Sequence, residues 1–279
     1  MSGYSRERAA TFYDDYGDRE WTRFEDGRSS PVSFEIHRHY LHRFVRSRDR
    51  VIDVGAGPGR FTIELARIGA CVTVVDISPT QLRLNEERLV AAEVEAQVAE
   101  RALADVLDLS RWPDGSFDAS VCYGGPISYT LDRAEEAIAE LFRVTSAGGV
   151  VLFSVMSRVG PFAHSLPVII DLVREYGIAM NDDVVSGGIL PPELSRGHLT
   201  MRLFRWSELA EILSSQPCEL LAASASELSP GAEHSLWPDL DPNLRDALIR
   251  WEIELAAEPG ALNAGSHIIV VARKTNHSS

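Results

Sequence analysis

The stretch VIDVGAGPGRFTIELA, residues 51–66, decides the fold. A short apolar run at 51–54 leads into alternating glycines and then into residues with helical spacing, which predicts a buried strand, a tight turn and a helix. Glycine tolerates positive φ and lacks the Cβ that would keep a ligand away from the backbone. The first turn of the helix offers unpaired N–H groups, so this loop predicts a site for a nucleotide-like ligand.

Strands and helices alternate on both sides of this loop as far as residue 156. Helices are predicted at 4–24, 33–46, 61–68, 80–94 and 133–145, and strands at 51–54, 71–75, 98–104, 117–122 and 150–155. Alternation of this length is typical of right-handed βαβ units with a parallel sheet. Beyond residue 156 the pattern breaks into a predicted helix at 161–176, a loop rich in Gly, Pro and Asp, a helix at 206–214, and strands at 220–225 and 267–272.

Composition bounds the class of protein. The 279 residues carry a formal net charge of -14, which argues against a nucleic-acid partner because phosphate backbones would be repelled. No apolar run is long enough to span a bilayer and the N-terminus lacks the apolar core of a secretory signal, so we expect a cytoplasmic protein without a membrane partner. Lys274 is the only lysine, which disfavours Schiff-base enzymes and P-loop NTPases. Cys71 and Cys122 lie in apolar runs and are expected to be buried.

Two classes of adenosine cofactor fit a glycine loop followed by an acidic strand end. Asp76 ends the next strand, where a carboxylate accepts both ribose hydroxyls. A dinucleotide site would carry G-x-G-x-x-G, whereas this loop is Gly55-x-Gly57-x-Gly59 with Asp53 inside the preceding strand. The spacing disfavours a nicotinamide-dependent oxidoreductase, which also usually needs a catalytic Tyr-x-x-x-Lys that this chain cannot supply.

Residues 51–76 resemble motif I and the following acidic strand end of class I S-adenosylmethionine-dependent methyltransferases. Further matches follow in order: ADV at 104–106 resembles the end of the third strand, PDGSFDASVCYGG at 113–125 the fourth strand and its exit loop, and LFRVTSAGGVVLFSV at 141–155 the fifth strand and its helix. The resemblance covers about residues 45–156. It implies a doubly wound, mostly parallel α/β sheet of the Rossmann-like type, with an antiparallel C-terminal strand.

The resemblance also divides the chain and assigns site residues. It implies an N-terminal helical cap at 1–46, a cofactor-binding core at 47–156, a substrate-covering insertion at 157–205 and the C-terminal part of the sheet at 206–279. The cofactor, S-adenosyl-L-methionine, would have its methionine part beside the glycine turn, its ribose on Asp76 and its adenine beside Asp105, with Asp108 as the alternative acid. The full set of expected cofactor contacts is Tyr16, Asp53, Gly55, Ala56, Gly57, Asp76, Ile77, Gln81, Asp105, Val106 and Tyr123.

The expected activity is methyl transfer to a small-molecule acceptor by in-line displacement at the sulfonium methyl. No catalytic triad is required, because positioning supplies much of the rate. His198 is the candidate general base and Tyr123 the candidate orienting group; an ordinary surface histidine is the alternative for His198. Tyr13, Tyr16 and Trp21 either cover the site or only pack an N-terminal helix.

Several alternatives stay open. Residues 123–126 read YGGP rather than the Asn/Asp-Pro-Pro-Tyr of many amino-methyltransferases that act on DNA bases or protein amides. This difference argues against a nucleic-acid or protein substrate. An apolar part of the insertion favours a greasy or aromatic acceptor, as in secondary metabolism. A methyltransferase-like binding protein or a non-methylating S-adenosylmethionine enzyme remains the other hypothesis. No metal site is expected, and a homo-oligomer is left open.

Overall fold

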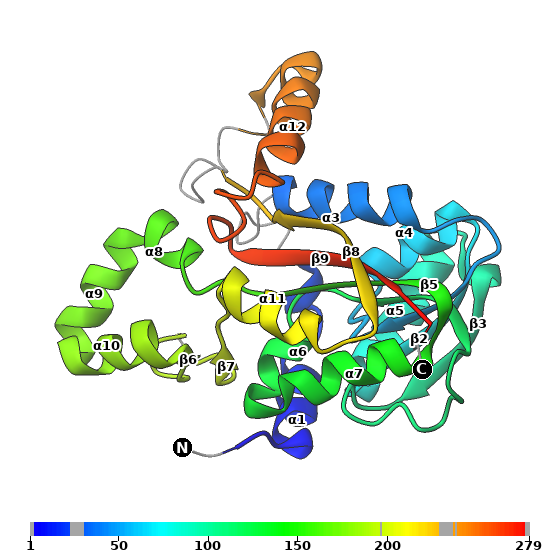
Figure 1. Cartoon of the computed structure of the whole chain (residues 1–279), viewed down its shortest axis with the longest axis horizontal. Helices are drawn as coiled ribbons and strands as arrows, with labels where there is room; N and C mark the ends of the chain where they lie inside the picture. The colour runs from blue at the N-terminus through cyan, green and yellow to red at the C-terminus, as the bar shows by residue number, and fades with distance from the viewer. Residues whose placement is uncertain (1–2, 23–30, 196, 229–236, 238, 277–279) are drawn as a thin grey trace.

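A seven-stranded sheet in the order β3-β2-β1-β4-β5-β9-β8 forms the centre of the computed structural model (Figure 1), which describes residues 3–22, 31–195, 197–228, 237 and 239–276. Its strands are β1 Arg50–Val54, β2 Cys71–Asp76, β3 Val98–Leu103, β4 Phe117–Cys122, β5 Thr145–Met156, β8 Cys218–Ala225 and β9 His267–Lys274. Strands β1 to β5 pair in parallel, and β9 runs antiparallel between β5 and β8. The expected doubly wound sheet with an antiparallel C-terminal strand is confirmed.

Helices cover both faces of the sheet. Val51 and Ile52 are neighbours on β1, and because successive strand residues point to opposite faces they are buried in two different apolar layers. One layer receives α7 (Ala134–Val144) and α11 (Trp206–Ser214); the other receives α3 (Pro31–Phe44), α4 (Arg60–Ile68) and α12 (Pro242–Ala256). The remaining helical segments of the core are α5 Pro79–Ala91, α6 Pro126–Tyr129 and the short 3-10 turns η1 Glu95–Gln97 and η2 Leu131–Arg133.

The strand order places a ligand-binding crevice between β1 and β4. From β1 the chain adds β2 and β3 on one side and then returns to add β4 and β5 on the other. Loops that leave the carboxyl ends of two such strands diverge, which opens a crevice at that edge. The N-terminal helices α1 (Arg6–Tyr16) and α2 (Arg19–Thr22) lie against this part of the domain, where α1 contacts α5.

The insertion after β5 differs from the prediction. Its expected helix at 161–176 is two helices, α8 (Gly160–His164) and α9 (Leu166–Tyr176), because Pro167 has no N–H to donate to the carbonyl of Ala163 and its ring would clash with that carbonyl in a continuous helix. The expected loop is also partly wrong, because α10 (Ile178–Gly187) precedes the hairpin β6 (Ile189–Leu190) and β7 (Met201–Arg202). Helices α8 to α10 extend away from the sheet (Figure 1), and the division into four segments stays a prediction.

Three further features were misjudged or missed. Helix α12 was not anticipated, and β5 begins at Thr145 rather than at residue 150. Cys71 is exposed at the start of β2, so its expected burial was wrong; Cys122 is buried as expected, and burial raises the pKa of its thiol. None of the described helices combines the length and the apolar character needed to cross a bilayer.

Candidate cofactor and acceptor site

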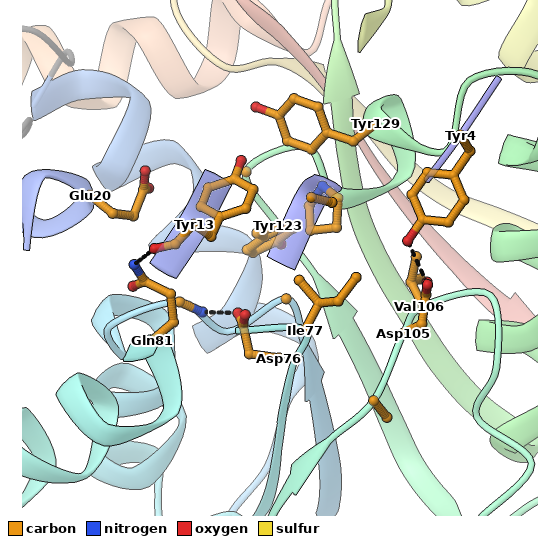
Figure 2. Close-up of a pocket in the computed structure, with 16 residues that line it drawn as sticks. Tyr4, Tyr13, Glu20, Asp76, Ile77, Gln81, Asp105, Val106, Tyr123 and Tyr129 are labelled. Carbon is orange, nitrogen blue, oxygen red and sulfur yellow. Dashed lines mark hydrogen bonds between the residues drawn. The ribbon is translucent and has the colours of Figure 1, made fainter. Parts of the chain in front are cut away.

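A pocket of about 690 Å³, counting its open mouth, lies at the carboxyl edge of the sheet (Figure 2). Four successive strand ends line it, after β1, β2, β3 and β4. It brings together eight of the residues expected from the sequence: Gly55, Gly57, Asp76, Ile77, Gln81, Asp105, Val106 and Tyr123. It adds eight that the sequence analysis did not assign to the cofactor: Tyr4, Ala9, Tyr13, Glu20, Ala104, Gly124, Pro126 and Tyr129.

The turn after β1 requires glycine for two physical reasons. Gly55 has a φ of +69°, which side-chain-bearing residues rarely adopt, and a Cβ there would overlap the ring of Pro126. The N–H of Gly55 donates to the carbonyl of Val75 at 2.8 Å, which ties the turn to the end of β2. The bare backbone of the turn therefore forms one wall of the pocket.

Asp76 is held by the backbone at the end of β2. The N–H of Gly57 donates to one carboxylate oxygen at 2.8 Å and the N–H of Ser78 donates to the other at 2.9 Å. Burial raises the pKa of Asp76 to about 6, although these backbone bonds favour the ionised form and lower it. The carboxylate is thus oriented, and each oxygen keeps lone pairs for a ligand hydroxyl.

Asp105 follows β3 and faces the pocket from the other side. The hydroxyl of Tyr4 donates to its carboxylate at 2.5 Å, and the N–H of Leu107 donates to the second oxygen at 3.0 Å. Burial first, and then the bond to Asp105, raises the pKa of Tyr4, so the phenol stays a donor. Asp108, the alternative acid, instead bonds Ser110 and does not line the pocket.

Asp53 lies beneath the glycine turn rather than on the pocket wall. Its carboxylate is buried and accepts a bond of 2.6 Å from the hydroxyl of Thr62 on α4. Burial raises its pKa to about 7, the nearby Asp76 adds to this increase, and the bond from Thr62 opposes it. Ala56 is also absent from the pocket lining.

We expect this buried acid to make stability depend on pH. Because the folded pKa of Asp53 is about 7 and its ordinary value is 3.8, the native state binds more protons than the unfolded chain between these pH values. The free energy of unfolding should therefore fall as pH rises from about 4 to about 7, by on the order of 4 kcal/mol.

Urea unfolding at several pH values measures this dependence. In Asp53→Asn this carboxyl no longer contributes to the free energy of unfolding. A plot of that free energy against pH should therefore have a shallower slope between pH 4 and pH 7. An identical slope in the variant would show that Asp53 is ionised in the folded protein throughout this range.

Helix α1 crosses the pocket and is bonded to the loops that form it. Asp14 accepts from the hydroxyl of Ser78 at 2.5 Å and from the N–H of Thr80 at 3.1 Å. The amide nitrogen of Gln81 donates to the carbonyl of Tyr13 (Figure 2) and to that of Gly17, both at 3.0 Å. The amide oxygen of Gln81 is buried and has no hydrogen-bond partner among the described residues, which leaves an acceptor at the pocket.

Helix α2 lies beside the pocket on the same side as α1 and is held there by contacts of Trp21. The guanidinium groups of Arg60 and Arg88 lie 4.1 and 4.7 Å from the centre of its ring, and Arg60 also donates to its carbonyl at 2.9 Å. Arg88 in addition pairs with Asp18 at 2.6 Å. Trp21 therefore fastens the N-terminal segment to α4 and α5 and does not line the pocket, whereas its neighbour Glu20 does.

His198 and Tyr16 lie behind the pocket wall. The ring of His198 stacks on Tyr129 with centroids 5.4 Å apart and lies 6.2 Å from Tyr13, and both tyrosines line the pocket. Phe12 contacts both the His198 ring, with centroids 4.6 Å apart, and the Tyr16 ring, at 5.5 Å. Neither His198 nor Tyr16 lines the pocket, so this arrangement supports a role in packing α1 against the insertion.

Tyr123 lines the pocket from the end of β4. Its ring contacts His37 of α3 at 4.7 Å and Phe61 of α4 at 5.1 Å, in edge-to-face arrangements. Its hydroxyl is buried without a hydrogen-bond partner among the described residues, and burial raises its pKa well above 10. In the described part of the chain no group of three His, Cys, Asp or Glu residues is arranged to hold a metal ion.

The comparisons with known proteins agree with this geometry. Residues 51–149 match the model of a methyltransferase domain family. Residues 51–149 are therefore similar in sequence to methyltransferase domains. The ubiquinone biosynthesis O-methyltransferase of Xanthomonas campestris is 33% identical to this chain over 123 residues, which are 43% of this chain and 48% of that protein. The chain thus spans about half the length of the curated relatives it matches.

Solved structures extend the similarity in fold beyond residues 51–149. The [4+2]-cyclase SpnF matches with a TM-score of 0.62 and 19% identity over 98% of this chain and 99% of that one. The 1,6-didemethyltoxoflavin-N1-methyltransferase of Burkholderia thailandensis, solved with bound S-adenosylhomocysteine, matches with a TM-score of 0.57 and 17% identity over 99% and 92%. The N-terminal helices and the insertion therefore belong to an arrangement that other proteins share.

Some of the missed residues carried a signal in the sequence. Gly124 and Pro126 stand in the quoted exit loop after β4, and Tyr13 had been singled out as a covering aromatic. Tyr4 and Glu20 lie far from any motif along the chain, and only the fold of the N-terminal segment brings them to the pocket.

Proposed function

We propose that this protein binds S-adenosyl-L-methionine in the pocket and transfers its methyl group to a small-molecule acceptor. The observation that carries the proposal is the convergence of the bare Gly55–Gly57 turn with two oriented carboxylates, Asp76 and Asp105, at the strand-order reversal of a methyltransferase domain. The Burkholderia neighbour, which binds S-adenosylhomocysteine, supports the same choice of ligand.

The chemistry of the lining fits this cofactor. Asp76 offers acceptors for two ribose hydroxyls, Asp105 offers one for the adenine amine, and the amide oxygen of Gln81 is a further buried acceptor. Of the described residues that line the pocket, Glu20, Asp76 and Asp105 are acids and none is Arg or Lys, which suits a positively charged ligand. When bound, the cofactor supplies an electrophilic methyl carbon on a sulfonium.

The residues of the chain itself act by positioning and by excluding water. Tyr13, Tyr123 and Tyr129 form an aromatic side of the pocket that can hold a flat or apolar acceptor against the cofactor site. Helix α1, fixed by Asp14 and Gln81, limits the access of water to that space. Tyr123 is better placed than His198 to orient an acceptor, because Tyr123 lines the pocket. A role in secondary metabolism and a cytoplasmic location are part of the proposal.

Incubation with the cofactor and a panel of phenols, amines and thiols tests the function. We expect S-adenosylhomocysteine and a product heavier by one methyl group to form in equal amounts, as followed by mass spectrometry. At a limiting concentration of cofactor, Asp76→Ala should slow the formation of S-adenosylhomocysteine and of the methylated product. The proposal would be contradicted if calorimetry showed that the protein does not bind S-adenosylmethionine, or that it binds a dinucleotide instead.

A second candidate function is the rearrangement of a small molecule, in which S-adenosylmethionine is bound but does not give up its methyl group. It is favoured by one observation, the match of nearly the whole chain to the cyclase SpnF. The two functions separate in the same assay. Binding of the cofactor together with conversion of an acceptor to an isomer, without release of S-adenosylhomocysteine, would favour the rearrangement.

A further inference from the structure

Helix α12 presents apolar side chains in two directions. Ile249, Ile253 and Ala256 pack against the layer formed by α3 and the sheet. On a different side Leu244, Trp251 and Leu255 are about half exposed, at 46%, 52% and 55%. Large side chains exposed together on one helix face are uncommon in monomeric proteins and mark interaction sites. In Figure 1 α12 projects beyond the sheet.

The spacing of the exposed residues is that of a coiled-coil seam. Leu244, Leu248, Trp251 and Leu255 follow at intervals of four, three and four, which is the d-a-d-a pattern of two heptads. At about 100° per residue these four side chains fall within an arc of roughly 60° on the helix. Leu248 is half-buried at the edge of this seam and joins it to the packed face.

The seam is complementary to itself when the helix is reversed. An antiparallel second copy, centred between Ile249 and Arg250, places Leu244 opposite Leu255 and Leu248 opposite Trp251, so that four apolar layers form. Beside the seam, Arg245 then lies about two residue rises, or about 3 Å along the axis, from the level of Glu252 of the second copy. Arg245 makes no ion pair with any residue in the described part of the chain, whereas Glu252 accepts a 2.7 Å bond from the N–H of Leu228.

We propose that α12 pairs antiparallel with α12 of a second copy, which makes the protein a homodimer. Two-fold symmetry requires one patch to complement itself, and the seam of Leu244, Leu248, Trp251 and Leu255 meets that requirement. One helix pair covers less than the roughly 1,600 Å² of a standard interface, so the dissociation constant should lie at about 10–100 μM. This pairing is independent of the proposed enzymatic function.

Sedimentation velocity over about 1–500 μM protein tests the pairing. We expect the sedimentation coefficient to rise from the monomer toward the dimer value across this range. Trp251→Glu should raise the dissociation constant about 30-fold or more, because an aromatic residue at the centre of an interface is buried on association. The matched control is Ile178→Glu, which changes a residue that is 68% exposed on α10 and should leave the association unchanged.

A cysteine pair tests the direction of pairing. In a Cys71→Ser background, which removes the exposed native thiol, Leu244→Cys with Leu255→Cys should form intermolecular disulfides on mild oxidation. Leu244→Cys alone should not, since the two copies of residue 244 lie about 16 Å apart along an antiparallel pair. Crosslinking of the single variant would indicate parallel pairing. A monomer at every concentration, or loss of the dimer in Ile178→Glu but not in Trp251→Glu, would overturn the proposal.

Discussion

Asp76→Ala is expected to weaken the binding of S-adenosylmethionine by about tenfold to a hundredfold, the equivalent of one charge-assisted hydrogen bond or slightly more. The carboxylate accepts backbone bonds from Gly57 and Ser78 and is fixed in the pocket before any ligand arrives. Replacing it removes the acceptors for the ribose and also frees the turn that the carboxylate holds. Isothermal titration calorimetry gives the affinity directly.

Two comparisons make this result specific to Asp76. Asp108→Ala removes an acid that lies three residues beyond Asp105 but does not line the pocket, and it should leave the affinity unchanged. Because the pKa of Asp76 is about 6, the wild-type affinity should fall as pH drops below 6, where the protonated carboxyl accepts ligand bonds less well. Unchanged affinity in Asp76→Ala would remove the residue from the site.

The part of the site that could be predicted from the sequence is the part built on strand ends. Residues that follow β1 and β2 reach the same edge because parallel strands end together, so Gly55, Asp76 and Ile77 needed only the strand assignments to be placed. Asp105 was less certain because β3 is only partly buried and its apolar pattern is weak. The bond from Tyr4 and the position of Asp108 favour Asp105.

The residues on α1, α2 and the insertion, which cover the pocket, could not be predicted in the same way. The position of Tyr4, Glu20 and His198 depends on how α1, α2 and the insertion fold back over the core, and this follows from long-range contacts such as Asp14 with Ser78. These contacts leave no periodic pattern in the sequence. Helix α12 was missed for a related reason, since its two apolar faces blur the single stripe by which a surface helix is recognised.

Gly55→Ala is expected to cost about 3 kcal/mol of stability and to abolish measurable cofactor binding. Positive φ at this position costs an alanine about 1 kcal/mol or more, and the overlap of the new Cβ with Pro126 adds about 1–3 kcal/mol as in other overpacked sites. Since Pro126 begins α6 and lines the pocket, relief of the overlap must move either α6 or the turn. Urea unfolding and calorimetry measure the two effects.

Gly148→Ala separates the cost of a positive φ from the cost of the overlap with Pro126. Gly148 also has a positive φ, of +80°, but no atom lies within 4 Å of the position of its Cβ, so only the backbone cost of about 1 kcal/mol should appear and cofactor binding should persist. In the Gly55→Ala/Pro126→Ala double variant the 2.3 Å approach to the ring is removed and only the 3.0 Å approach to the Cβ of residue 126 remains, so the stability should recover in part toward that of Gly148→Ala. Equal losses in Gly55→Ala and Gly148→Ala would mean that the contact with Pro126 does not shape the turn, because a turn free to relax away from the ring would pay only for its backbone conformation.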